Sequence, residues 1–269
     1  MNNMRPTRIQ SSILLPVLLS LPTLAACDGM TEESVADNSD RSMQAQEKWY
    51  SMNPLDQHGK MTYDAKNAAS GYGVTWDCSR KKYIFFYDYR GQLCDGNVAT
   101  DDTTASGNVA FFTALFGDRA HSQNHHFLRD GAEGLDTACT NAKADLYVGT
   151  VTALSWRAAG DDANFQRAIG VITHIIQDSF APAHTRRDAS SANYSHLLDL
   201  CSIHEDVPGA CRHPEPFFPQ SADDADVNPT LAGLAVSATT DYLIAVAKVA
   251  TNQDPNALGP AIEKWFQCP

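Results

Sequence analysis

Three residues near the middle of the chain, His174, Asp178 and His184, have the side chains and the spacing of ligands to one metal ion. Residues four apart on a helix lie on the same face, so His174 and Asp178 can contact a single ion together. Pro182 ends the predicted helix, and His184 can return to the same ion from the following loop. Two imidazoles and a carboxylate suit zinc. The alternative is an ordinary pair of histidines with a capping aspartate.

Further candidates stand upstream of this segment. The pair His126-Phe127 lies 48 residues before His174, and Trp49 and His58 stand near the start of the globular pattern. Together with the first three residues, this pattern resembles the signature of the zinc-dependent phospholipase C and P1/S1 nuclease superfamily, and it is most similar to the bacterial phospholipases C. The resemblance implies an all-helical fold that holds two or three Zn²⁺ ions between its helices, with Trp49, His58, His126 and the first three residues among the ligands.

The chain departs from the family pattern at two places. The family has an aspartate upstream of the His-Phe pair that bridges two zinc ions and is a candidate general base. The nearest acid here is Asp118, which we assign as catalytic residue and metal ligand; an ordinary surface aspartate is the alternative. The family also ends its ligand set with a histidine and an acid one helical turn later. No such pair follows His184, so His204 and His213 are our candidates, with His196 competing.

Three histidines, His121, His125 and His126, fall within six residues. Only one of them can occupy the family position, and we assign His126 because Phe127 follows it. We expect the other two to be solvent-exposed neighbours.

The N-terminus predicts export. Two arginines precede an apolar run over 13–24, which is too short to span a bilayer, and small residues follow it. Residues 1–26 are therefore a predicted signal peptide. Its end resembles a bacterial lipobox, which would make Cys27 lipidated and anchor the protein to a bacterial membrane, in the periplasm or at the cell surface. The alternative is an ordinary signal peptide with a chance cysteine. The polar, acidic stretch 28–48 is a flexible tether or a propeptide, and its cleavage would give a secreted protein.

The remaining cysteines predict disulfides. They are even in number, and an exported protein folds in an oxidising compartment. Their spacing lacks the CxxC pattern of a structural zinc site. Local spacing favours Cys78–Cys94 and Cys201–Cys211, which leaves Cys139–Cys268.

Composition limits the classes of partner. The 269 residues are 43% hydrophobic, enough for a core, and 32 acidic against 20 basic residues give a formal charge of −12. A broad electrostatic grip on nucleic-acid backbone needs clustered lysine and arginine, so we expect no stable nucleic-acid complex. The partner we expect is a phospholipid at a membrane surface, and we expect the protein to be a monomer.

Helical periodicity dominates the elements that must position the ligands. An aromatic, β-rich stretch over 82–92 predicts a hairpin with a turn near Arg90-Gly91, and the proline-rich segment 206–229 is expected to be irregular. The fold class is therefore all-α: a single multi-helix domain over 49–269 with a small β-hairpin insertion. The predicted helices cover 58–70, 109–116, 133–159, 163–180 and 230–251, with a short one after Pro260.

The resemblance and the predicted membrane tether together favour a phospholipase C that cleaves phosphatidylcholine-type lipids to diacylglycerol and a phosphorylated head group. One alternative is a single-strand nuclease of the P1/S1 type, which would need aromatic pockets for base stacking. Another is a non-catalytic zinc-binding lipoprotein, because the final ligand pair is incomplete.

Overall fold

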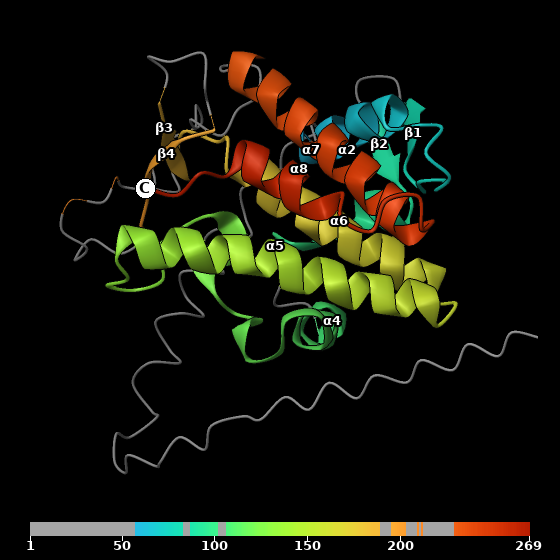
Figure 1. The fold of residues 1–269 in the computed structure, drawn as a ribbon, viewed down its shortest axis with the longest axis horizontal. Helices are drawn as coiled ribbons and strands as arrows, with labels where there is room; N and C mark the ends of the chain where they lie inside the picture. Colours follow the sequence, from blue (N-terminus) through green and yellow to red (C-terminus); the bar gives the residue numbers. More distant parts are fainter. Residues whose placement is uncertain are drawn as a thin grey trace, which may run out of the picture.

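A computed structural model describes residues 57–82, 87–101, 106–188, 195–202, 209, 211 and 229–269 (Figure 1). Several predicted features lie outside these residues: the signal peptide and tether over 1–48, Cys27, Trp49, His204 and His213. Within the described part the protein is mostly helical, as the sequence predicts, and it has two short antiparallel strand pairs.

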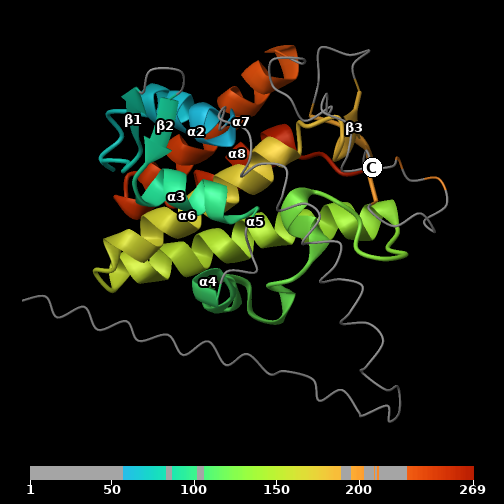
Figure 2. The same ribbon diagram turned by 180° about the vertical axis from the view of Figure 1, so that it is seen from behind.

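Helix α6 (Asp162–Asp178) is the centre of the fold. It packs against α5 (Leu135–Ala158) on one side and against α2 (Gln57–Ala68), α3 (Gln92–Ala99) and α7 (Pro229–Ala250) on the other (Figures 1 and 2).

The sequence of α6 explains this central position. Asp161 caps its first turn by accepting a hydrogen bond from the backbone N–H of Asn164. Every residue from position 168 to the end of the helix is buried. A helix that is buried on all sides needs partners all round, and the polar side chains among these residues must find partners inside the protein.

The crossing of α3 and α6 is unusually close, because glycine stands at the contact on both helices. A Cβ atom added at Gly170 of α6 would lie 2.1 Å from the carbonyl oxygen of Leu93, and one added at Gly96 of α3 would lie 1.9 Å from that of Arg167. Neither position has room for a side chain, so backbone packs directly on backbone. This contact sets the place of the segment that follows α3.

The remaining helices cover this centre. Helix α4 (Ser106–Phe116) packs on α5, and α8 (Leu258–Trp265) packs on α7. The helices predicted over 58–70, 109–116, 133–159, 163–180 and 230–251, and the short one near Pro260, are confirmed to within a few residues.

The predicted hairpin is confirmed, but its turn is not where we expected it. Strands β1 (Ser79–Lys82) and β2 (Tyr87–Arg90) are antiparallel, and Lys82 pairs with Tyr87, so both strands lie before Gly91 in the chain. The turn predicted at Arg90-Gly91 is wrong. Gly91 has a φ of 115° and leads from β2 directly into α3, a helix that the sequence did not predict.

A second strand pair was also not predicted. Strands β3 (Thr185–Arg187) and β4 (Leu197–Leu200) pair antiparallel at the end of the molecule opposite the first hairpin (Figures 1 and 2). They are only three and four residues long, so neither gives a periodicity that the sequence could reveal.

The three predicted disulfides are confirmed. Cys78–Cys94 joins the first hairpin to α3, Cys139–Cys268 joins the start of α5 to the C-terminus, and Cys201–Cys211 closes a short loop after β4.

Among the described residues α7 has the length and hydropathy of a membrane span. Its inward face, however, contributes Tyr242, Leu243 and Val246 to the hydrophobic core, where they are almost completely buried. This face of α7 is therefore part of the core of the fold.

Candidate metal centre

Six histidine and aspartate side chains meet where α2, α3 and the end of α6 come together. Five of them are among the predicted ligands, and the sixth was not predicted. All are buried except Asp101, which is partly exposed: His58, Asp101, His126, His174, Asp178 and His184.

The end of α6 supplies two of these side chains as the spacing predicts. His174 and Asp178 stand one turn apart, with 3.0 Å between His174 Nε2 and Asp178 Oδ2. The helix ends at Asp178, and a turn follows in which the backbone N–H of His184 donates to the carbonyl of Ala181. This turn returns the His184 ring to Asp178, with 3.7 Å between Nδ1 and Oδ2.

The short 3-10 helix Gln123–His126 supplies the next ligand candidate. It ends at Phe127, whose φ of 53° lies in the left-handed region. The Phe127 ring is buried and lies 5.3 Å from the ring of Phe266, centroid to centroid. This anchor holds His126 over α6, where its Nδ1 is 2.8 Å from Asp178 Oδ2.

The rings of His126 and His184 are linked through the backbone. His184 Nδ1 donates to the carbonyl oxygen of His126 at 2.5 Å. A backbone carbonyl can only accept, so Nδ1 of His184 carries the proton and Nε2 carries the lone pair. This is the arrangement in which a metal-binding histidine is usually held.

His58 reaches the group from the first turn of α2. Its Nε2 is 3.4 Å from Asp178 Oδ1, and its ring stacks on that of His174 at a centroid distance of 4.2 Å.

Asp101 was missed by the sequence analysis. It follows α3 directly, and its Oδ1 is 3.3 Å from His174 Nε2. It looked like part of a polar loop because α3 itself was not predicted. The sequence offers one weak indication of a ligand here: Asp101 and Asp102 are adjacent acids upstream of His126.

Asp118 does not join the group, which corrects its assignment as bridging carboxylate. It stands in the short 3-10 helix Gly117–Arg119 with an exposed side chain. Its neighbour Arg119 turns inward to pair with the buried Asp145, and this leaves Asp118 facing solvent.

Two overlapping sets of these side chains could each hold an ion. In each set the ligand atoms lie within 4.8 Å of one another: His58, His174 and Asp178 in one, and Asp101, His126 and His174 in the other. His174 belongs to both sets, and its Nε2 faces both Asp101 and Asp178, so the two sets share a nitrogen that can bind only one ion at a time.

The charges within the group are strongly coupled. Burial alone would raise the pKa of Asp178, but the nearby imidazoles of His174 and His184 hold it well below its usual value. Burial alone would lower the pKa of His174, but the carboxylates of Asp101 and Asp178 hold it well above its usual value. Burial, and then the nearby His174 ring, lower the pKa of His58. The group thus concentrates negative charge that attracts a cation or a proton.

The ring nitrogens of His174 show that this group fits a metal. Both are buried: Nδ1 has no hydrogen-bond partner within the described part of the chain, and Nε2 lies 3.0 Å from Asp178 and 3.3 Å from Asp101 without hydrogen-bond geometry. Buried polar atoms without partners are rare and call for an explanation such as an ion. Imidazole nitrogens with carboxylate oxygens suit zinc, whereas calcium and magnesium prefer all-oxygen ligands.

The two other histidines of the 121–126 segment lie apart from this group. His121 is exposed, as predicted. His125 is buried, which corrects that prediction: its ring lies against that of Phe116, tilted, at a centroid distance of 4.0 Å, and its Nε2 is 3.4 Å from Asp145 Oδ2. Burial and the neighbouring His126 hold the pKa of His125 well below its usual value, so it is a neutral core residue.

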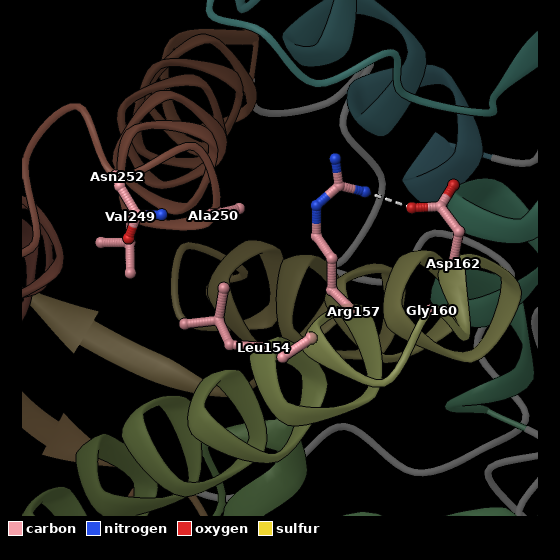
Figure 3. A pocket seen from close by; sticks show the side chains of 8 residues that line it. Leu154, Arg157, Gly160, Asp162, Val249, Ala250 and Asn252 are labelled. Atoms are coloured by element: carbon pink, nitrogen blue, oxygen red, sulfur yellow. Dashed lines mark hydrogen bonds and ion pairs between the residues drawn. The ribbon is translucent and has the colours of Figure 1, made fainter. Parts of the chain in front are cut away.

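A cavity of about 560 Å³ lies elsewhere, between the ends of α5 and α7 (Figure 3). Leu154 and Val249 give it apolar walls, and an ion pair between Arg157 and Asp162 crosses its edge. Asp162 begins α6 and His174 stands twelve residues later, which places the cavity about 18 Å along the helix from the metal centre. It is not part of that centre.

Comparison of the chain with models of protein families, with curated proteins and with solved structures finds no match. The function is therefore inferred from the residues themselves and from their arrangement.

Proposed function

We propose that this protein is a zinc-dependent phosphodiester hydrolase, and that its substrates are phosphatidylcholine-type phospholipids, cleaved to diacylglycerol and a phosphorylated head group. The observation that carries the proposal is the meeting of three histidines and two aspartates in two ligand sets that share His174, with a fourth histidine, His184, beside Asp178. Two neighbouring metal ions are typical of enzymes that cleave phosphate esters.

Zinc ions bound there supply Lewis acidity: they lower the pKa of water so that a nucleophile is available at neutral pH, and they neutralise charge on phosphoryl oxygens. The chain itself is acidic, with a formal charge of −12. Bound cations would therefore provide the local positive charge that an anionic substrate needs.

The two carboxylates of the centre have different surroundings, and we assign them different roles. Asp178 is 2% exposed and has four imidazoles around it, so it holds histidine rings in place as an ionised centre of charge. The side chain of Asp101 is 13% exposed and has solvent access. We assign Asp101 the role of accepting a proton from the attacking water, in place of Asp118.

Lipid is favoured over nucleic acid as the substrate by two features of the sequence. The predicted lipobox would tether the protein to a membrane, close to phospholipid. The acidic composition opposes binding to nucleic acid, because acidic residues outnumber lysine and arginine. Few basic side chains are therefore available to displace the counterions of the phosphate backbone.

The test is release of phosphocholine from phosphatidylcholine vesicles by the purified full-length protein supplied with zinc. We expect release that a zinc chelator stops and added zinc restores. His174→Ala should reduce it to the rate of the chelated protein, whereas His121→Ala, which changes an exposed histidine nearby, should leave it unchanged.

Two results would contradict the proposal. Cleavage of single-stranded nucleic acid without release of phosphocholine would favour a nuclease. Neither activity in a protein that binds zinc would favour a non-catalytic zinc lipoprotein.

A further inference from the structure

A buried row of hydroxyl and amide groups lies directly behind the metal centre. It runs from Thr173 on α6 through Asn97 on α3 to Gln177 on α6, and Gln177 contacts both Thr62 and His58 on α2. Four of these residues are 0–2% exposed and belong to neither ligand set: Thr173, Asn97, Gln177 and Thr62. Thr173 and Gln177 stand one residue before His174 and Asp178, so they form a parallel row on the same helix.

The donors and acceptors in this row can be assigned from the carbonyl oxygen of Gly170, which can only accept a hydrogen bond. Thr173 Oγ1 lies 2.7 Å from the carbonyl oxygen of Gly170 and must donate its single proton there. Its lone pairs then accept from Asn97 Nδ2 at 3.0 Å. This contact identifies which end of the Asn97 amide carries the protons.

The orientation of the Gln177 amide is fixed next. Asn97 Nδ2 also lies 3.2 Å from Gln177 Oε1, so that atom is the acceptor end of the amide. At the other end Gln177 Nε2 donates to Thr62 Oγ1 at 2.9 Å. Both ends of the amide are therefore assigned by their neighbours.

The tautomer of His58 follows from the amide of Gln177. His58 Nδ1 is 2.8 Å from Gln177 Oε1, so Nδ1 must carry the proton and donate it. In a neutral ring Nε2 then presents a lone pair, and this lone pair faces Asp178 Oδ1 at 3.4 Å. Two acceptors that face each other in a buried site repel, so this pair favours a positive charge between them, either a proton or a metal ion.

We propose that Gln177 is a positioning residue for the metal centre: it holds His58 as the Nδ1–H tautomer and so points the Nε2 lone pair at the ion. The role in metal binding rests on the proposed zinc centre. The assignment of the His58 tautomer rests only on its hydrogen bond to Gln177. Helix α6 would then provide two ligands, His174 and Asp178, and also the group that orients a third.

The first test is the zinc affinity of the full-length protein, measured by competition with a chelator. Gln177→Met keeps the length of the side chain and removes the acceptor, and we expect affinity to fall by about 10- to 100-fold, as for other groups that orient a metal ligand. Gln177→Glu keeps an acceptor oxygen and should bind zinc more tightly than Gln177→Met.

The matched control is Gln166→Met. Gln166 is also a buried glutamine of α6, and its amide bonds the backbone of Thr75 and Asp77, far from the ligands. We expect this variant to bind zinc as the unchanged protein does, even if it is less stable.

The second test is ¹⁵N NMR of the histidine rings in the metal-free full-length protein. We expect His58 to carry its proton on Nδ1, and to populate both tautomers in Gln177→Met. If that variant does not fold, Thr62→Val removes the hydroxyl that orients the amide and should give a smaller loss of the same kind.

A neutral His58 ring with its proton on Nε2 and none on Nδ1 in the unchanged protein would overturn the inference. So would a folded Gln177→Met variant with unchanged zinc affinity, or one equal in affinity to Gln177→Glu. If the unchanged protein bound no zinc, the proposed function would fail, and the NMR result would still decide the role of Gln177.

Discussion

Among the individual residues, His174 has the greatest influence on the centre, because its ring lies in both ligand sets. It stands between two carboxylates, with Nε2 at 3.3 Å from Asp101 and 3.0 Å from Asp178. Without metal, these carboxylates stabilise a proton on the His174 ring. With metal, the same carboxylates stabilise a metal ion bound at that position, so a proton and a metal ion compete for it.

This competition predicts how zinc binding depends on pH. The carboxylates hold the pKa of His174 well above its usual value, even though burial opposes them. Below that pKa the ring is protonated, and zinc must displace the proton before it can bind. Below this pKa, we expect zinc affinity to fall by up to about tenfold for each unit by which the pH is lowered, for each proton displaced. Above the pKa, we expect the affinity to stay constant. Chelator competition between pH 5 and 9 measures this, and an affinity independent of pH would exclude it.

The choice between two aspartates can also be tested. Asp101 contacts His174, whereas Asp118 is exposed and distant from the ligand sets. Asp101→Asn should therefore weaken zinc binding by at least about tenfold, since a ligand matters at least as much as a group that orients one. Asp118→Asn should have no effect. The reverse pattern would restore the assignment that the family resemblance suggested.

At the scale of elements, the site depends on how closely α3 crosses α6. Asp101, a candidate metal ligand, follows α3, and Asn97 lies within it. The position of α3 therefore determines where both residues stand relative to the ligands on α6. The crossing in turn depends on Gly96 and Gly170, where backbone meets backbone.

A single methyl group at this crossing should have two effects. Gly170→Ala places a Cβ atom 2.1 Å from a backbone carbonyl, which must move. We expect a loss of about 1–3 kcal/mol in the free energy of unfolding, together with weaker zinc binding.

The control for this change is Gly233→Ala in α7, where nothing lies within 4 Å of the added atom. There the better helix propensity of alanine should raise the free energy of unfolding by up to about 1 kcal/mol. Urea denaturation measures both variants. Equal stabilities would mean that the crossing is not tightly packed.

The same elements show what the sequence could reveal. The ligands of α6 could be predicted because their spacing matches the helical repeat and the helix has a strong apolar pattern. Helix α3 could not, because its eight residues include Gly96, Asp95 and Asn97, which are poor helix formers. It is helical through its tertiary contact with α6, and Asp101 was therefore hidden in an apparent loop.

At the scale of the whole molecule, one disulfide joins segments that are far apart in the sequence, and the other two are local. Cys139–Cys268 spans 129 residues and ties the C-terminus to α5, whereas Cys201–Cys211 spans 10. Their pairing could be predicted from parity and local spacing alone, without knowledge of the fold.

Loss of the long-range disulfide should cost more stability than loss of the short one. From the loop entropy released, replacing both cysteines of the 139–268 pair with serine should cost about 5 kcal/mol, against about 3 kcal/mol for the 201–211 pair. Thermal unfolding of the two double variants compares them. A smaller effect for the long-range pair would show that packing of α8 already fixes the C-terminus.

The central claim is that the group around Asp178 binds zinc, and the most direct measurement is the zinc content of the purified full-length protein by elemental analysis. The two overlapping ligand sets predict at least one zinc ion per chain. Because both sets contain His174, His174→Ala should retain less zinc than the unchanged protein, and His121→Ala should retain all of it. Less than one zinc per chain in the unchanged protein, or an equal content in His174→Ala, would contradict the claim.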